Sequence, residues 1–263
     1  MSWEDYFKPG AMSGWYDYID INVVKLPDNL PMPPTDDFSL LFAQCWHLQD
    51  ISSLSNWDVS KVRNMNRMFE NCCKLKDITA LAKWNVSNVE NMEGVFSQCR
   101  ELQDITALAD WDIGKVTSIR CMFYGCEQLK DISALSSWNV SNVCDMSYMF
   151  RECKRIQDIT ALSNWDVSNV WDMSGMFHSC EQLQDISALA KWNVSSVEHK
   201  DVMFYDCYTK ADLTPLLGKG NDHKEPITGS PTLLFQWEIN ELKTHITRLE
   251  KKITELTEMI ERK

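Results

Sequence analysis

The sequence predicts an α/β repeat solenoid, with short parallel strands joined by turns and short helices, followed by a C-terminal α-helical coiled coil. The first indication is a tryptophan that recurs every 27 residues without any insertion, at Trp57, Trp84, Trp111, Trp138, Trp165 and Trp192. A fixed period of this size is typical of solenoid proteins. The second indication is a C-terminal run of isoleucine and leucine at heptad spacing, which is typical of a coiled coil.

Composition excludes several classes of protein before any motif is considered. The chain has 263 residues, a net charge of −12 and 44% hydrophobic residues, so it can bury a sizeable core. Residues 233–263 hold six acidic and six basic side chains, so the acidic excess lies on residues 1–232. An acidic body repels phosphate groups and anionic lipids, and we therefore expect neither a nucleic-acid nor a membrane partner.

The sequence also carries an expectation about location. Residues 1–20 contain acidic and aromatic side chains rather than the apolar run of a secretory signal, and no stretch of about 18 apolar residues occurs. The ten cysteines would then be reduced thiols rather than a disulfide framework. We expect an intracellular protein or one associated with a virion or another assembly.

Residues 1–41 precede the repeats and are expected to form an N-terminal cap. They are rich in aromatic residues and contain a bend at Pro31, Pro33 and Pro34. The first repeat of a solenoid exposes an apolar face that needs cover, which such a segment can supply. A ligand-binding aromatic patch is the alternative interpretation.

Residues 42–217 are expected to form the solenoid and its C-terminal cap. Seven phenylalanines and seven cysteines follow the 27-residue period, at Phe42, Phe69, Phe96, Phe123, Phe150, Phe177 and Phe204, and at Cys45, Cys72, Cys99, Cys126, Cys153, Cys180 and Cys207. Apolar residues fall at every third position, which fits short strands and tight turns coiled around a shared core. We expect one strand per repeat, as at 143–149, and one helical turn, as at 132–136 after the capping residue Asp131.

The repeat phrase resembles that of a known family. Residues 165–180 read Trp-Asp-Val-Ser-Asn-Val-Trp-Asp-Met-Ser-Gly-Met-Phe-His-Ser-Cys. This phrase is similar to the unit of the BspA-like leucine-rich-repeat family, also described as the bacterial surface protein 26-residue repeat. The resemblance covers about residues 42–207 and implies an elongated scaffold used for adhesion or protein binding.

Residues 218–231 have the composition of a linker, and residues 232–263 are expected to form a coiled-coil helix. Isoleucine occupies every a position and leucine every d position of the heptads, at Ile239, Leu242, Ile246, Leu249, Ile253, Leu256 and Ile260. This choice of residues favours a parallel dimer, with a trimer as the alternative. The chain would therefore associate with itself through this segment.

Two recurring polar residues have competing interpretations. The cysteines could form a ladder of disulfides, but their odd number and the absence of a Cys-x-x-Cys zinc motif favour free, buried thiols. A recurring aspartate could bind calcium, or each copy could accept backbone N–H bonds in a turn, at Asp50, Asp77, Asp104, Asp131, Asp158, Asp185 and Asp212. The repeat lacks the glycine-rich turns of calcium solenoids, which favours the turn.

The sequence offers little basis for catalysis. The five histidines share no repeat position, and we find no nucleotide-binding glycine loop, nucleophile elbow or His-Glu-x-x-His motif. We therefore expect a protein that is not an enzyme and that has no catalytic residue, no metal site and no cofactor.

Protein binding is the leading interpretation, because some positions vary from repeat to repeat and are not needed to build the core. Aromatic and basic side chains at these positions are the types that dominate binding interfaces, and we take Tyr124, Tyr148, Arg151, Trp171 and His178 as a candidate patch. Scattered surface aromatics are the competing interpretation. We expect a non-enzymatic scaffold that binds other proteins and is multimerised by its coiled coil. The alternatives are a structural subunit of a virion or appendage, and a cell-surface adhesin exported without a classical signal.

Overall fold

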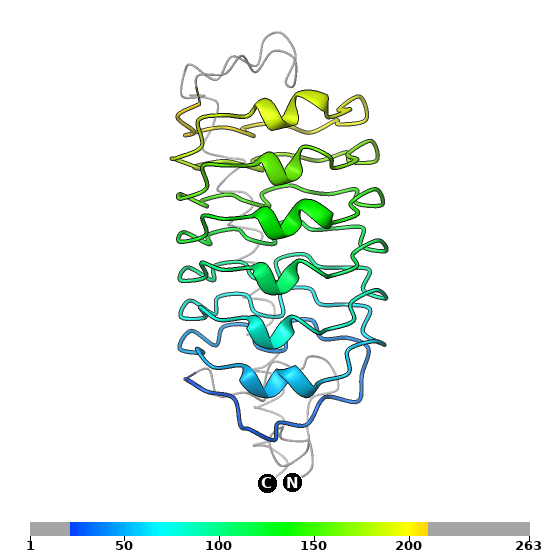
Figure 1. The fold of residues 1–263 in the computed structure, drawn as a ribbon, viewed down its shortest axis with the longest axis vertical. Coiled ribbons are helices and arrows are strands. Elements are labelled where there is room, and N and C mark those ends of the chain that lie inside the picture. Colours follow the sequence, from blue (N-terminus) through cyan, green and yellow to red (C-terminus); the bar gives the residue numbers. More distant parts are fainter. Residues whose placement is uncertain (1–21, 210–263) are drawn as a thin grey trace, which may run out of the picture. The chain divides into compact units, whose positions relative to one another are not determined.

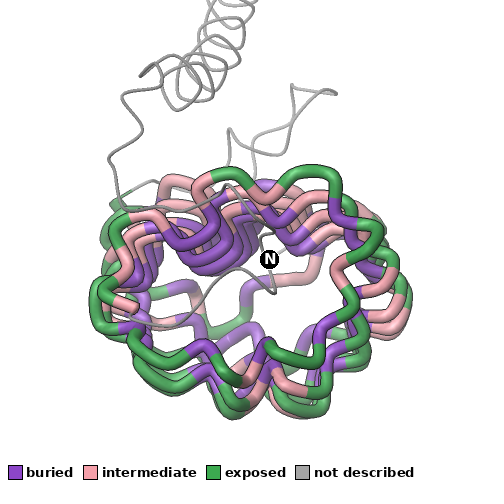
Figure 2. Tube along the Cα trace, turned by 90° about the horizontal axis from the view of Figure 1, so that it is seen from above, coloured by how far each residue is buried: buried purple, intermediate pink, exposed green. Residues whose placement is uncertain are grey.

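A computed structural model of the chain describes residues 22–209, which form a stack of coils, one for each repeat (Figure 1). Parallel bridges join residues that are 27 positions apart, beginning with Asp37 and Asn64 and ending with Asp172 and His199. Seen along the axis, the coils superimpose, with their buried positions in common (Figure 2). The 27-residue period of the sequence is therefore the length of one turn of the solenoid.

Short 3₁₀-helices lie one above another along one side of the stack (Figure 1). They are η2 (Ser52–Asn56), η3 (Thr79–Leu81), η4 (Thr106–Leu108), η5 (Ser133–Ser137), η6 (Thr160–Leu162) and η7 (Ser187–Lys191). In η5, the backbone N–H of Leu135 donates to the carbonyl of Ile132 at 3.0 Å, and Trp138 is extended with φ −67° and ψ 127°. The expected helical turn is therefore confirmed as a 3₁₀ turn.

The opposite side of each coil differs from the expected strand. Among residues 22–209, the parallel pairing consists of isolated bridges, so the prediction of a strand at 143–149 is wrong. The reason is two residues per coil with left-handed backbone, such as Tyr148 (φ 58°) and Glu152 (φ 62°). A positive φ ends an extended strand and suits the third position of a tight turn.

These turns still hold neighbouring coils together. The N–H groups of Met146, Tyr148 and Phe150 donate to carbonyls of the next coil at 2.8–2.9 Å. Between them, the N–H of Met149 closes a turn within the coil by donating to the carbonyl of Met146 at 3.3 Å. Alternate amides thus form a ladder of hydrogen bonds between coils, while the others form hydrogen bonds within their own coil. Buried backbone N–H groups need such partners, because leaving them unpaired costs free energy.

The core is built from side chains that repeat in every coil. The phenylalanine rings from Phe42 to Phe204 stack on one another with centroids 5.3–5.9 Å apart. Each tryptophan from Trp57 to Trp192 is at most 7% exposed, and its indole N–H donates to a leucine carbonyl of the preceding coil at 2.9–3.2 Å. The tryptophan phrase is therefore part of the architecture.

The cysteines are free thiols, as expected. From Cys72 to Cys180, each thiol of this repeat position donates to a phenylalanine carbonyl of the preceding coil at 3.1–3.2 Å. Burial raises the pKa of these thiols, as at Cys72 and Cys99. They are protonated and unreactive at neutral pH, because the thiolate is the reactive form.

Candidate interaction surface

The recurring aspartates form a uniform edge beside the 3₁₀-helices. In each described copy, the carboxylate oxygen Oδ1 accepts the backbone N–H of the residue two positions on, at 2.8–2.9 Å. The bond from the Ser133 amide lowers the pKa of Asp131, so this carboxylate stays ionised. The interpretation of these aspartates as turn residues is confirmed.

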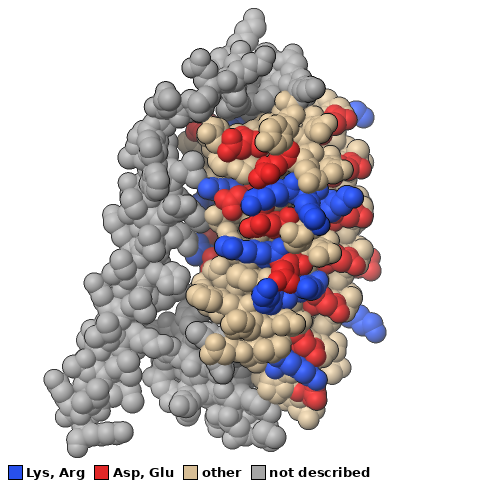
Figure 3. Space-filling view, turned by 90° about the vertical axis from the view of Figure 1, so that its left-hand side faces the viewer, with Lys and Arg blue, Asp and Glu red and all other residues tan. Residues whose placement is uncertain are grey.

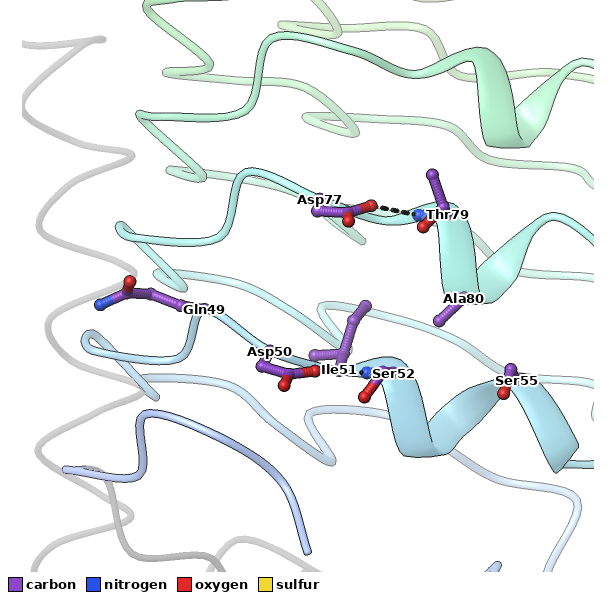
Figure 4. A pocket seen from close by; sticks show the side chains of 8 residues that line it. All are labelled: Gln49, Asp50, Ile51, Ser52, Ser55, Asp77, Thr79 and Ala80. Carbon is purple, nitrogen blue, oxygen red and sulfur yellow. Dashed lines mark hydrogen bonds between the residues drawn. The ribbon is translucent and has the colours of Figure 1, made fainter. Parts of the chain in front are cut away.

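Shallow pockets lie between consecutive coils along this edge. One of about 510 Å³ is lined by Asp50, Ser52, Asp77 and Thr79, and Figure 4 shows the bond between Asp77 and the amide of Thr79. A similar pocket lies further along the stack, between Asp131 and Asp158. Within residues 22–209, no group of three or more histidine, cysteine, aspartate or glutamate side chains could hold a metal ion.

A neighbouring edge of the stack carries charges of both signs, and Figure 3 shows acidic and basic side chains interspersed over it. Opposite charges also pair between coils in the described part of the chain: Arg63 Nη1 lies 2.8 Å from Glu90 Oε1, Lys154 Nζ lies 3.4 Å from Glu127 Oε2, and Lys74 pairs with Glu101. Exposed pairs of this kind contribute little to stability. Because acidic and basic side chains are interspersed, this edge has no continuous patch of a single charge (Figure 3).

On a third surface the side chains at one repeat position differ from coil to coil. Four of the five predicted binding residues lie on this surface. Tyr124, Arg151, His178 and Tyr205 occupy one repeat position in successive coils, and Tyr148 occupies a nearby position. We call these five residues the Tyr–Arg–His column. The next coil leaves room for the Tyr148 ring, because a Cβ at Gly175 would lie 2.5 Å from it.

Cation–π contacts connect this column. The Arg151 guanidinium carbon lies 5.3 Å from the centre of the Tyr124 ring and 5.8 Å from that of Tyr148. The Arg120 guanidinium carbon also lies 5.2 Å from the centre of the Tyr148 ring, and Arg120 Nη1 donates to Ser147 Oγ at 2.7 Å. The rings of His178 and Tyr205 are 5.0 Å apart. Such contacts strengthen when they are shielded from water.

Two buried polar atoms in the column lack a hydrogen-bond partner. Arg151 is 7% exposed and His178 is 6% exposed, and neither Arg151 Nε nor His178 Nε2 is bonded within the described part of the chain. Glu152 Oε1 lies 3.4 Å from Arg151 Nε, but it is not aligned for a hydrogen bond. Burial and the charge of Arg151 lower the pKa of His178 to about 4, so its ring is neutral at pH 7.

The fifth predicted residue lies apart from the column. Trp171 is 43% exposed and contacts the ring of His199, with centroids 5.6 Å apart. The predicted patch left out Arg120, which also stands at a variable repeat position, and missed Tyr205, which could have been found because it shares the repeat position of Tyr124 and Arg151. The predicted oligomerisation residues, from Ile239 to Ile260, lie outside the described residues.

Sequence comparison connects this repeat architecture with a family. Residues 36–158 and 130–213 match the family described as "Mycoplasma protein of unknown function, DUF285". The chain belongs to this family. No curated protein matches it.

Among solved structures, an internalin C2 from Listeria monocytogenes matches with a TM-score of 0.27 and 16% sequence identity. The match covers 66% of this chain and 64% of that one, so the chain spans less than two thirds of its length. A likeness this weak supports no structural or functional argument. In residues 22–209, no helix has the length and apolar character needed to cross a membrane.

Proposed function

We propose that this protein is a non-enzymatic scaffold of the BspA-like leucine-rich-repeat type, and that it binds another protein through the Tyr–Arg–His column. The observation that carries the proposal is the contrast between this column and the rest of the solenoid. Phenylalanine, tryptophan and aspartate recur in coil after coil, whereas the column presents tyrosine, arginine, histidine and tyrosine in turn. Tyrosine and arginine are enriched among the residues that dominate binding energy.

The chemistry of the column supports recognition of a protein. Tyr124 and Tyr148 are partly exposed rings, and each holds the Arg151 guanidinium near its face. Rings packed in this way lose little side-chain entropy on binding, since they are already ordered. The inter-coil pockets beside the aspartates have less to offer a protein partner, because their carboxylates already accept backbone N–H bonds.

The second part of the proposal is self-association through the heptads at 239–260, which rests on the sequence. Two copies joined by this segment would bind a multivalent partner with higher avidity, provided that the linker at 218–231 spans the sites. Light scattering of the full chain and of a 1–231 truncation tests this part. The full chain should show at least twice the mass of one subunit, and the truncation the mass of one. Equal numbers of subunits in both would refute it.

Site-specific photo-crosslinking tests the binding surface. A benzoylphenylalanine placed at Tyr124 should give a discrete adduct with another protein when the full chain is irradiated in its native source. The matched control is the same group at Thr160, an exposed position on η6. Adducts of equal yield at both positions, or an adduct at Thr160 alone, would refute the proposed surface.

A further inference from the structure

The unpaired atoms of Arg151 and His178 point to the chemistry of the partner. An unsatisfied buried donor costs about 1–3 kcal/mol, and each one in a native structure needs an explanation. Here two such atoms occur on neighbouring coils, which the bond from the Glu152 amide to the His178 carbonyl joins at 2.8 Å. Because the two side chains occupy one repeat position on adjacent coils, a single acceptor shared by both atoms would explain them.

Both atoms can act as donors. Arg151 Nε always carries a hydrogen, because the guanidinium does not deprotonate in proteins. His178 Nδ1 lies 2.9 Å from the Ser179 hydroxyl oxygen. When this hydroxyl donates to Nδ1, the neutral ring carries its hydrogen on Nε2. Arg151 Nε–H and His178 Nε2–H are then two buried donors without an acceptor among the described residues.

We propose that Arg151 and His178 form a receptor for one carboxylate of an acidic segment in the partner protein, an inference that rests on the proposed function. A carboxylate supplies two acceptor oxygens in one plane, which matches two N–H donors and favours a charge-assisted bond to arginine. The half-buried rings of Tyr124 and Tyr148 exclude water from the guanidinium and so strengthen that bond.

In the absence of a partner, the carboxylate of Glu152 lies beside Arg151, where the partner's carboxylate would bind. Its Oε1 lies 3.4 Å from Arg151 Nε, which balances the charge but leaves the N–H unpaired. Its side chain is 28% exposed, so it can turn towards solvent when an aligned carboxylate arrives. A phosphate suits the site less well, because it would place about two charges beside Glu152 on a chain of net charge −12.

The test uses the full chain with ¹⁵N-labelled histidine, titrated with sodium acetate against sodium chloride at equal ionic strength. Acetate should shift the His178 Nε2 resonance in a saturable manner. R151K keeps the charge but loses the Nε–H, and it should raise the acetate concentration at half saturation by about tenfold or more. R155K, an exposed arginine of the same coil, should leave it unchanged within about twofold.

A second variant keeps the test decisive if R151K does not fold. E152Q removes the competing charge, and acetate should then bind several times more tightly. A linear response to acetate, an equal response in R151K, or no gain in E152Q would overturn the proposal. Inorganic phosphate that binds as tightly as acetate and depends on Arg151 would also overturn it, in favour of a phosphate site.

The failure of this inference can be told apart from failure of the proposed function. If the photo-adduct at Tyr124 forms as strongly in R151K as in the wild type, the carboxylate receptor is wrong while the binding surface stands. If no adduct forms at Tyr124 although acetate binds saturably, the receptor stands and the proposed protein-binding surface is wrong.

Discussion

The aspartate edge and the Tyr–Arg–His column run along the same stack of coils but follow opposite rules. Along the edge, every coil presents the same residue making the same bond, from Asp50 to the Ser52 amide and onwards. Along the column, successive coils present different side chains, and two buried atoms lack a hydrogen-bond partner among the described residues. In a repeat protein, repetition marks what builds the solenoid, and departure from it marks what distinguishes this chain.

Breaking a repeated core position should have the largest effect on stability. Phe123 is fully buried between Phe96 and Phe150, so Phe123→Ala should reduce the free energy of unfolding by about 3–5 kcal/mol. Urea denaturation followed by tryptophan fluorescence measures this. Arg155→Ala is the surface control and should change stability by less than about 0.5 kcal/mol. Similar losses for the two variants would contradict the division into core and surface.

The buried histidine predicts a loss of stability between pH 7 and pH 5, whereas a recurring aspartate such as Asp131, with its lowered pKa, loses its contribution at more acidic pH. The folded pKa of His178, about 4, lies below its ordinary value of 6.5, so the unfolded chain binds more protons as the pH falls. The contribution of neutral His178 to the free energy of unfolding is present above pH 6.5 and is lost as the pH falls towards 4. Between pH 7 and pH 5 it should amount to about 2 kcal/mol.

Comparison of the wild type with His178→Gln isolates this contribution from that of the carboxylates. Chemical denaturation at the two pH values should show a smaller loss of stability in the variant, by about 2 kcal/mol. Equal losses in the two proteins would show that His178 is not held neutral by its surroundings.

The aspartate edge should give the smallest effect and tolerate a swap of acceptor. Asp131→Ala removes the acceptor for the Ser133 amide at the start of η5 and should cost about 1 kcal/mol. Asp131→Asn keeps an acceptor oxygen and should cost much less, since asparagine accepts the same kind of bond at Asn139. Thermal unfolding of the two variants measures the difference. If Asp131→Asn lost more stability than Asp131→Ala, the negative charge would matter more than the hydrogen bond in the turn.

The sequence predicted the period, the buried tryptophans, the free thiols and the aspartate turns, because each depends on local spacing that recurs. It did not predict the backbone at 143–149, where apolar spacing alone cannot distinguish a strand from turns with a left-handed residue such as Tyr148. Four of the five predicted binding residues meet because the period is constant. Trp171 does not, since its repeat position leads to the neighbourhood of His199.

The unpaired atoms were beyond prediction from the sequence. Whether Arg151 Nε finds a partner depends on the orientation of Glu152, a matter of side-chain geometry. No spacing rule in the sequence carries that information.

The most direct test of the distinction between repeated and unique positions is the yield of the Tyr124 photo-adduct in two backgrounds, R151K and D158N. Both residues belong to the same region of the stack, one to the column and the other to the aspartate edge. R151K should lower the yield by about tenfold, the effect of losing one charge-assisted hydrogen bond, and D158N should leave it unchanged. A yield that falls in D158N and persists in R151K would contradict the account.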